Sequence, residues 1–374
     1  MSCLYLHIPF CRTKCQYCSF NSQARLDSLY PRYNQALRAE LLSIKSDKAV
    51  LETLFIGGGT PTVMNVLDLA ALVETCRDRF SFIKGAEICL EANPESIDYG
   101  FLSALREAGF NRLSIGIQSL NDGELKKLGR IHDAAMAREA FIDARKAGFD
   151  NLSIDLMYGL PGQSAKSWRH TLQGVLELSP RHLSAYQLTI EEHTGFHCLE
   201  AEGRLALPAE DSLLEMDEIT QELCKPAGLQ QYEISNFAEP GYECRHNLNY
   251  WHNDEYFACG AGSVSYVGGV RERRVDDPLK YCQAVEQSSD LIEEREELTT
   301  RDSFKETVVM GLRLVAGIST SRRLQQRYGL SLDEVYGETL VKLIEQGLIS
   351  HDGARLALTE TGRRFANQVM AELV

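Results

Sequence analysis

The sequence predicts an α/β protein that begins with a partial barrel of six βα units. Three observations predict this fold: six short β-rich runs alternate with helical patterns, one helix–Gly–Phe–strand unit occurs twice, and the final segment reads as helices around one hairpin. Strands that are separated by helices pair in parallel. We therefore expect a barrel over 1–192, a mixed α+β extension over 193–300 and a C-terminal module over 301–374.

The predicted strands are short runs rich in β-branched and aromatic residues. Apolar residues at helical spacing fill the gaps between several of them, over 29–44, 67–80 and 135–149. The strands are expected at 4–10, 53–59, 87–93, 112–119, 151–159 and 182–190.

A repeat supports the βα units. Residues 106–119 and 145–159 share the order helix, Gly, Phe, strand, with an offset of 39 residues. Gly109 and Gly148 are predicted to end their helices, because glycine adopts the left-handed conformation readily. Six units favour an open or partial barrel over a closed one of eight strands, and a doubly wound sheet is the alternative fold.

The C-terminal module is predicted to be winged-helix-like. Its helices are expected at 303–315, 320–328 and 331–346, followed by a hairpin that turns at Asp352-Gly353 and a last helix from Glu360. Residues 317–374 hold seven basic and seven acidic residues. A DNA-binding domain normally has a net positive charge, which this segment lacks. We therefore expect the module to serve in packing or in binding a partner.

Charge and hydropathy narrow the possible partners. The chain has 39 Lys and Arg against 53 Asp and Glu, a net charge of −14, which repels nucleic acid and anionic lipid surfaces. It has neither a secretion signal nor an apolar run long enough to span a membrane. We therefore expect a cytoplasmic protein with no membrane span and no nucleic-acid partner.

Only three of the eleven cysteines are clustered, in the pattern CxxxCxxC. An odd number of cysteines in a chain without a signal peptide does not suggest a disulfide framework. Eight of them are scattered and are expected to be small buried residues. The clustered three are Cys11, Cys15 and Cys18.

Three kinds of site could use these thiols. A structural zinc site normally needs a fourth protein ligand, and no second CxxC pair follows. A thioredoxin-like site would use Cys15 and Cys18 but would leave Cys11 without a role. An iron–sulfur cluster uses all three and leaves one iron open to a ligand.

Polar residues follow the other predicted strands. The carboxyl ends of parallel barrel strands meet at one mouth, where active sites lie. Gly57-Gly58-Gly59-Thr60-Pro61 follows the second strand, where glycines allow close approach and offer N–H groups to an anion. The next three strand ends carry Glu91, Gln118 and Asp155.

With GGGTP downstream, CxxxCxxC resembles the radical S-adenosylmethionine (SAM) superfamily. The resemblance implies a partial (β/α)6 barrel and a [4Fe–4S] cluster on Cys11, Cys15 and Cys18, whose open iron chelates SAM. Carried over residue by residue, it places SAM against Tyr5, Tyr17, Gly58, Gly59, Thr60, Glu91, Gln118, Arg130 and Asp155.

The segments YLHIPFC (5–11), GGGTPT (57–62), SIGIQS (114–119) and DLMYGLPGQ (155–163) resemble the coproporphyrinogen III oxidase group, to which the HemW heme chaperones are similar. The decarboxylating oxidases carry CxxxCxxCxC, but this chain has Phe20 where their last cysteine lies. Residues 246–251, HNLNYW, match the HNxxYW motif of HemW. His246 is therefore the candidate heme ligand, and Cys244 and His252 are the alternative candidate ligands.

The resemblance implies a heme chaperone that carries heme as cargo and delivers it to acceptor proteins such as membrane-bound respiratory enzymes. The resemblance also allows a cytoplasmic protein that attaches peripherally to the inner face of the membrane. Oxygen-independent coproporphyrinogen III oxidase is the alternative function, so the sequence leaves open whether the chain is an enzyme.

Overall fold

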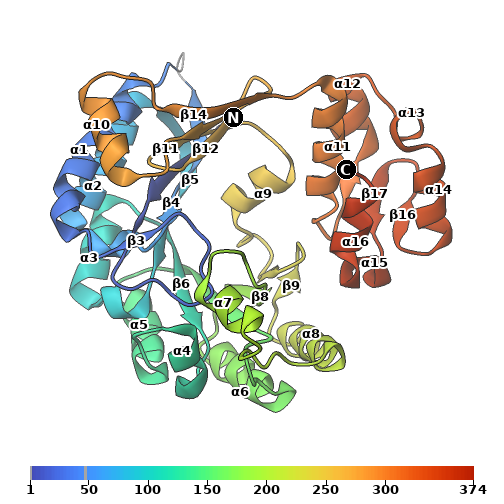
Figure 1. The fold of residues 1–374 in the computed structure, drawn as a ribbon, viewed down its shortest axis with the longest axis horizontal. Helices are drawn as coiled ribbons and strands as arrows, with labels where there is room; N and C mark the ends of the chain where they lie inside the picture. Colours follow the sequence, from blue (N-terminus) through green and yellow to red (C-terminus); the bar gives the residue numbers. More distant parts are fainter. Residues whose placement is uncertain (1, 46–48) are drawn as a thin grey trace.

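The computed structural model describes residues 2–45 and 49–374. A curved sheet flanked by helices forms one side of the molecule, and the C-terminal module forms the other (Figure 1). The short helix α9 (Arg245–Trp251) lies between them. Among the described residues, no helix has the length and apolar character needed to cross a membrane.

Six neighbouring parallel strands form the centre of the sheet, as the sequence predicts. Each of the six predicted strands is present, so this part of the prediction is confirmed. Their order in the sheet follows their order in the chain, without the reversal that a doubly wound sheet requires. The strands are β1 (Ser2–Ile8), β4 (Val50–Gly58), β5 (Ser81–Ala92), β6 (Arg112–Gln118), β7 (Asn151–Tyr158) and β8 (His182–Gln187).

Helices connect these strands along the outer face (Figure 1). Side chains of Asn65, Asp98, Asp133 and Ser164 cap the first turns of four of them. Gly109, predicted to end its helix, has a φ of 101°. The helices are α1 (Tyr30–Ser43), α2 (Val66–Arg79), α3 (Tyr99–Ala108), α4 (Asp122–Leu128), α5 (Ala134–Lys146) and α6 (Ala165–Leu176).

The barrel is open, because strands of the extension continue the sheet at both edges. β11 (Tyr256–Cys259) runs parallel to β1, and β12 (Val264–Val267), β13 (Val270–Arg274) and β14 (Ile292–Glu297) follow it in antiparallel order. At the other edge, β10 and β9 add antiparallel pairs beside β8. The short elements of this region are α7 (Gly195–Ala201), α8 (Glu210–Cys224), β9 (Gln230–Gln231), β10 (Asn236–Ala238) and α10 (Pro278–Glu286).

The C-terminal module has its own apolar core and a three-stranded sheet. The predicted hairpin turns at Asp352-Gly353, but the predicted helix over 331–346 is broken at Gly337, whose φ of 48° is outside the helical region. The elements are α11 (Thr300–Gly311), β15 (Ile318–Ser319), the π-helical η4 (Thr320–Gln325), α12 (Gln326–Tyr328), α13 (Leu332–Tyr336), α14 (Glu338–Glu345), β16 (Ile349–His351), β17 (Arg355–Leu358), α15 (Glu360–Arg364) and α16 (Ala366–Ala371).

Candidate functional site

The three clustered cysteines lie in one loop after β1. Two short strands, β2 (Phe10–Cys11) and β3 (Gln23–Ala24), pair in parallel and close this loop at its base. Gln16 anchors the middle of the loop, since its N–H donates to the carbonyl of Leu128 and its own carbonyl accepts from Phe196. Cys11 is buried, whereas Cys15 and Cys18 are partly exposed.

Two polar side chains contact the thiols, Thr60 from the end of β4 and Arg130 from the segment after α4. Thr60 Oγ1 lies 3.6 Å from Cys11 Sγ and donates to it. Arg130 Nη1 donates to Cys15 Sγ at the same distance. Burial raises the pKa of the Cys11 and Cys18 thiols, and the neighbouring cysteines raise it further. Metal binding at this loop must therefore displace thiol protons.

These residues fit an iron–sulfur cluster by their chemistry. The cluster needs soft thiolate ligands, and the loop supplies three that influence one another electrostatically. A partly buried cation, Arg130, lies beside Cys15 and compensates negative charge. Across residues 2–45 and 49–374, no three His, Cys, Asp or Glu side chains lie close enough together to hold a metal ion, so the fit rests on the residue type of the three thiols and their shared loop, and not on the distances between them.

The glycine triplet allows the end of β4 to pack closely against the end of β1 and the residues that follow it. A Cβ at Gly58 would lie 2.6 Å from the His7 ring, and one at Gly59 would lie 2.5 Å from the Phe10 carbonyl. Gly59 N–H donates to the Ile8 carbonyl and Gly58 N–H donates to Glu91 Oε2. The expectation of N–H groups that are free to bind an anion is therefore wrong for Gly58 and Gly59, because the protein itself uses both groups.

Two partly buried carboxyl groups, Glu91 on β5 and Asp155 on β7, lie near each other on the sheet. Burial first and the charge of Asp155 second raise the pKa of Glu91 to about 8, against the opposing hydrogen bond from Gly58. Burial also raises the pKa of Asp155, while Ser114 Oγ donates to its two oxygens at 3.0 and 2.9 Å. These neighbouring carboxyl groups favour an arrangement in which one holds a proton.

Arg130 joins the cysteine loop to the neighbouring strand ends. Its Nη2 donates to Asn93 Oδ1 and to the Gly116 carbonyl, both at 2.6 Å. Asn93 Nδ2 in turn donates to Thr60 Oγ1 at 2.9 Å. Gln118 ends β6 in the left-handed region with a φ of 66°, a strained conformation that concentrates at functional sites. The structure thus connects Arg130 and Thr60 through Asn93, which the sequence analysis did not select.

Two tyrosines predicted to contact SAM lie on different elements. Tyr17, in the cysteine loop, packs against the apolar cluster of Leu128, Leu160 and Phe196. Tyr5, on β1, lies in the barrel interior, where its hydroxyl hydrogen-bonds His7 Nδ1 at 2.9 Å. His7 Nε2 bonds the Asn21 carbonyl at 2.8 Å, so this nitrogen carries the proton and Nδ1 accepts from Tyr5.

His246 lies on α9 and points into the same interior. It is buried, and its ring stacks on Phe55 with 5.0 Å between ring centroids. Nδ1 lies 2.6 Å from Thr53 Oγ1, and Nε2 lies 2.9 Å from the Tyr250 hydroxyl. Burial lowers the pKa of His246 to about 3, so the imidazole is neutral. Both nitrogens have partners, and one must be released before His246 could ligate iron.

Comparison with known proteins agrees with this architecture. The family model described as Radical SAM superfamily matches residues 5–174, and HemN C-terminal domain matches 298–365. The heme chaperone HemW of Bacillus subtilis is 38% identical over 99% of this chain and 98% of its own, and that of Escherichia coli is 35% identical over 98% and 96%. The chain belongs to the HemW family.

The same architecture occurs in a solved structure. Coproporphyrinogen III oxidase (HemN) from Escherichia coli, described as a radical SAM enzyme, superposes with a TM-score of 0.86 and 26% identity. The match covers 100% of this chain and 90% of that chain. The partial barrel and the separate C-terminal module that the sequence predicts are therefore confirmed.

In this HemW-family chain, the two alternative ligands beside His246 differ in accessibility. Cys244 is buried against Glu87, and its pKa is raised to about 12 by burial first and by the Glu87 charge second, so its thiol holds its proton. His252, at the other end of α9, is partly exposed. Its Nδ1 has no hydrogen-bond partner among the described residues.

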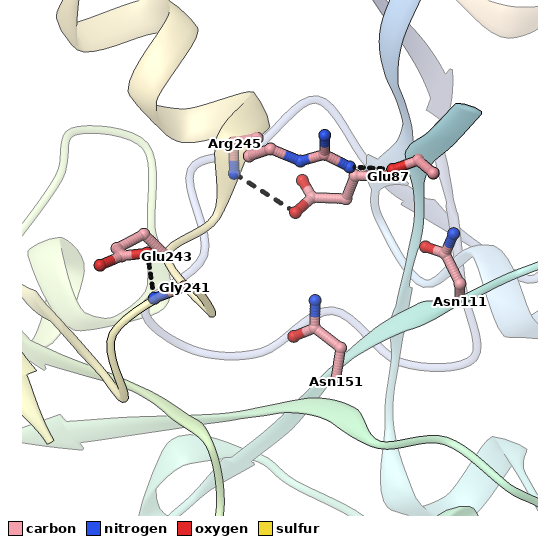
Figure 2. A pocket seen from close by; sticks show the side chains of 7 residues that line it. Glu87, Asn111, Asn151, Gly241, Glu243 and Arg245 are labelled. Atoms are coloured by element: carbon pink, nitrogen blue, oxygen red, sulfur yellow. Dashed lines mark hydrogen bonds between the residues drawn. The ribbon is translucent and has the colours of Figure 1, made fainter. Parts of the chain in front are cut away.

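Glu87 fixes the start of the HemW-motif helix. Its Oε1 accepts from the His246 N–H at 3.2 Å and its Oε2 accepts from the Arg245 N–H at 3.3 Å. Figure 2 shows Glu87 and Arg245 beside Asn111 and Asn151 in a polar pocket of about 320 Å³ at the amino ends of the strands. No sequence pattern indicates this role of Glu87, because a single Glu in a strand has no distinctive spacing.

Proposed function

We propose that this chain is a heme chaperone, which binds heme together with a [4Fe–4S] cluster and SAM and passes heme to an acceptor protein. One observation carries the proposal: the HNLNYW segment forms α9, and its His246 packs on Tyr5 in the barrel interior. The motif helix α9 therefore contacts one of the residues that we propose for SAM binding. Relatives named heme chaperones match over nearly the full chain.

The cysteine loop would hold the cluster, and the strand ends would hold SAM. A reduced cluster with SAM bound supplies the chemistry of reductive SAM cleavage. The protein contributes neutral and charged partners around it: Arg130 as cation, Tyr5 as aromatic face and Glu91 as acceptor for hydroxyl groups. The other proposed SAM contacts are Tyr17, Gly58, Gly59, Thr60, Gln118 and Asp155, and the cluster ligands are Cys11, Cys15 and Cys18.

His246 is proposed as heme ligand in a conformation where Tyr250 has turned away. A neutral imidazole with a free nitrogen is the form that binds iron. The Tyr250 hydroxyl occupies Nε2 in the conformation described above, while Thr53 holds Nδ1. Movement of one phenol side chain would thus expose a nitrogen that is already oriented by its other hydrogen bond.

Coproporphyrinogen III oxidase activity is the second candidate, which the likeness to HemN favours. The fourth cysteine position of the oxidase motif argues against it, since Phe20 occupies that position and is 68% exposed. We place the working protein in the cytoplasm, with peripheral docking at the inner membrane face when the acceptor is a membrane-bound respiratory enzyme.

A heme-transfer assay tests the proposal. The cluster-reconstituted protein is loaded with heme and mixed with an apo-acceptor, with and without SAM and reductant, and transfer is followed by absorbance. We expect heme to move to the acceptor and coproporphyrinogen III to remain unchanged in a parallel incubation with SAM. Robust formation of protoporphyrinogen would overturn the chaperone assignment in favour of the oxidase.

A further inference from the structure

The C-terminal module contacts the end of α9, the helix that carries the HNLNYW segment. Asn253, just after α9, donates through Nδ2 to Thr307 Oγ1 at 3.0 Å and to Glu306 Oε2 at 3.1 Å. The next residue, Asp254, accepts from Arg323 Nη1 at 2.6 and 2.7 Å. Contacts from α11 and η4 therefore fix the segment that carries Trp251.

Arg313, just after α11, lies over the Trp251 ring. Its guanidinium carbon is 4.5 Å from the ring centroid, a distance at which cation and ring attract each other. Arg313 is partly exposed, and within residues 2–45 and 49–374 its buried Nε has no hydrogen-bond partner. A buried N–H group without a hydrogen-bond partner is costly, which points to a group that the protein itself does not supply.

The acidic side chain near Arg313 does not neutralise it. Glu233 is fully buried, and its Oε2 has no hydrogen-bond partner in the described part of the chain. Burial raises the pKa of Glu233, while attraction to Arg313 opposes that rise. Because Glu233 Oε2 forms no hydrogen bond in the described part of the chain, Arg313 does not donate to it, and the guanidinium stays available to an anion.

More positive charge surrounds His252, next to Trp251. Burial lowers the pKa of His252 first, and the charges of Arg323 and Arg355 lower it further, while Asp254 opposes them. Arg323 forms an ion pair with Asp254, so this carboxylate already has a cationic partner other than His252. This junction is therefore locally basic in a chain whose net charge is −14, which suits an anionic, flat ligand.

We propose that Arg313 binds a carboxylate of a porphyrin whose flat ring approaches Trp251, at the junction of α9 and the C-terminal module. This inference rests on the proposed heme-chaperone function and names the contact that recognises the cargo. A guanidinium offers paired N–H donors that match a carboxylate. The indole supplies an aromatic edge or face beside it. The C-terminal module would thus recognise the acidic edge of heme.

Paired ligands and variants test this inference. Heme and heme dimethyl ester, which lacks free carboxylates, are titrated into the full-length protein with its cluster, and affinity is followed by absorbance. We expect Arg313→Gln to weaken heme binding about tenfold or more but to leave the ester unchanged. Arg313→Lys should recover part of the loss. Arg169→Gln, which removes an exposed arginine paired with Glu222 far from α9, is the matched control.

The outcomes separate the two proposals. Equal affinities of Arg313→Gln and the unmodified protein for heme would overturn the carboxylate contact while leaving the chaperone function intact. An equal loss for heme and its ester would also overturn it, because a structural defect affects both ligands alike. If the unmodified protein binds neither ligand, the proposed function itself fails and this inference falls with it.

Discussion

The Tyr5 ring lies beside the His246 ring, tilted by 33° with 6.3 Å between ring centroids, and the Tyr5 hydroxyl forms a hydrogen bond with His7. His7 in turn donates a hydrogen bond to the Asn21 carbonyl in the cysteine loop. One side chain thus contacts the histidine of the HNxxYW motif with its ring and supports the cysteine loop with its hydroxyl. Because ring and hydroxyl have separate neighbours, substitutions can separate their roles.

Tyr5→Phe is predicted to weaken the cysteine loop without disturbing His246. The change removes the hydroxyl that donates to His7 Nδ1 but keeps the ring against Phe55 and His246. Loss of one buried hydrogen bond costs about 1 kcal/mol. We expect faster loss of cluster absorbance in the presence of an iron chelator, with an unchanged heme titration.

Tyr5→Leu is the comparison variant, since it removes the ring as well. It should accelerate cluster loss and also change the heme titration, because Phe55 and His246 lose an aromatic neighbour. Unchanged cluster lifetime in Tyr5→Phe would show that His7 does not transmit support to the loop.

Glu91 is predicted to make stability fall as pH rises. Its pKa is raised to about 8 from an ordinary 4.5, so the folded chain binds more protons than the unfolded chain between these values. The free energy of unfolding therefore decreases as pH rises through this window, by a few kcal/mol at most, since one unit of pKa corresponds to about 1.4 kcal/mol. Denaturant titrations at several pH values measure this slope.

Glu91→Gln isolates that contribution, because Asp155 has a raised pKa as well. The glutamine cannot ionise, so the variant should lose the part of the slope between pH ~5 and pH ~8 that Glu91 causes. Identical slopes in both proteins would rule out Glu91 as the titrating group. SAM binding at pH 7 should also release a proton, if its hydroxyls require ionised Glu91.

Each clustered cysteine is predicted to be essential for the cluster. Serine at position 11, 15 or 18 removes one of three soft ligands, so the iron and sulfide content and the visible absorbance of the anaerobically reconstituted protein should fall to background. Cys198→Ser is the matched control, because Cys198 is exposed on α7 outside this loop. Full cluster content in any of the three variants would remove that residue from the ligand set.

Sequence patterns predicted the barrel well because each of its strands and helices is specified by residues that are close together in the chain. Alternating runs and the repeated helix–Gly–Phe–strand unit depend on neighbouring residues, and all six strands lie where they were expected. The break of a predicted helix at Gly337 was missed, since one glycine also occurs within continuous helices. The joining of β11 and β10 to opposite edges of the sheet depends on long-range pairing that no local pattern encodes.

The site was predicted only in part for the same reason. The motif residues could be identified from their spacing, but the residues that contact and position them are distant in the sequence. Asn93 lies between Arg130 and Thr60, Glu87 lies at the start of α9, and Arg313 lies over Trp251. The two occupied nitrogens of His246 were also invisible in the sequence, because Thr53 is nearly two hundred residues away along the chain. The assignments of individual cluster, SAM and heme residues stay predictions.

His246→Ala is predicted to weaken heme binding and leave the cluster intact, whereas Tyr250→Phe should strengthen heme binding. The phenylalanine removes the hydroxyl that occupies Nε2, while Thr53 still orients the ring through Nδ1. Release from one hydrogen bond of about 1 kcal/mol corresponds to an affinity gain of about fivefold. Heme titrations followed by absorbance measure both changes.

His252→Ala decides between the two histidines, because His252 has an Nδ1 without a partner among the described residues and needs no side chain to move first. If His246 ligates iron, His252→Ala should keep the heme spectrum of the unmodified protein, and Tyr250→Phe should bind heme more tightly. The opposite pattern, in which His246→Ala binds normally and His252→Ala loses the spectrum, would transfer iron ligation to His252. His246 would then be a buried support that joins α9 to Thr53 and Tyr5.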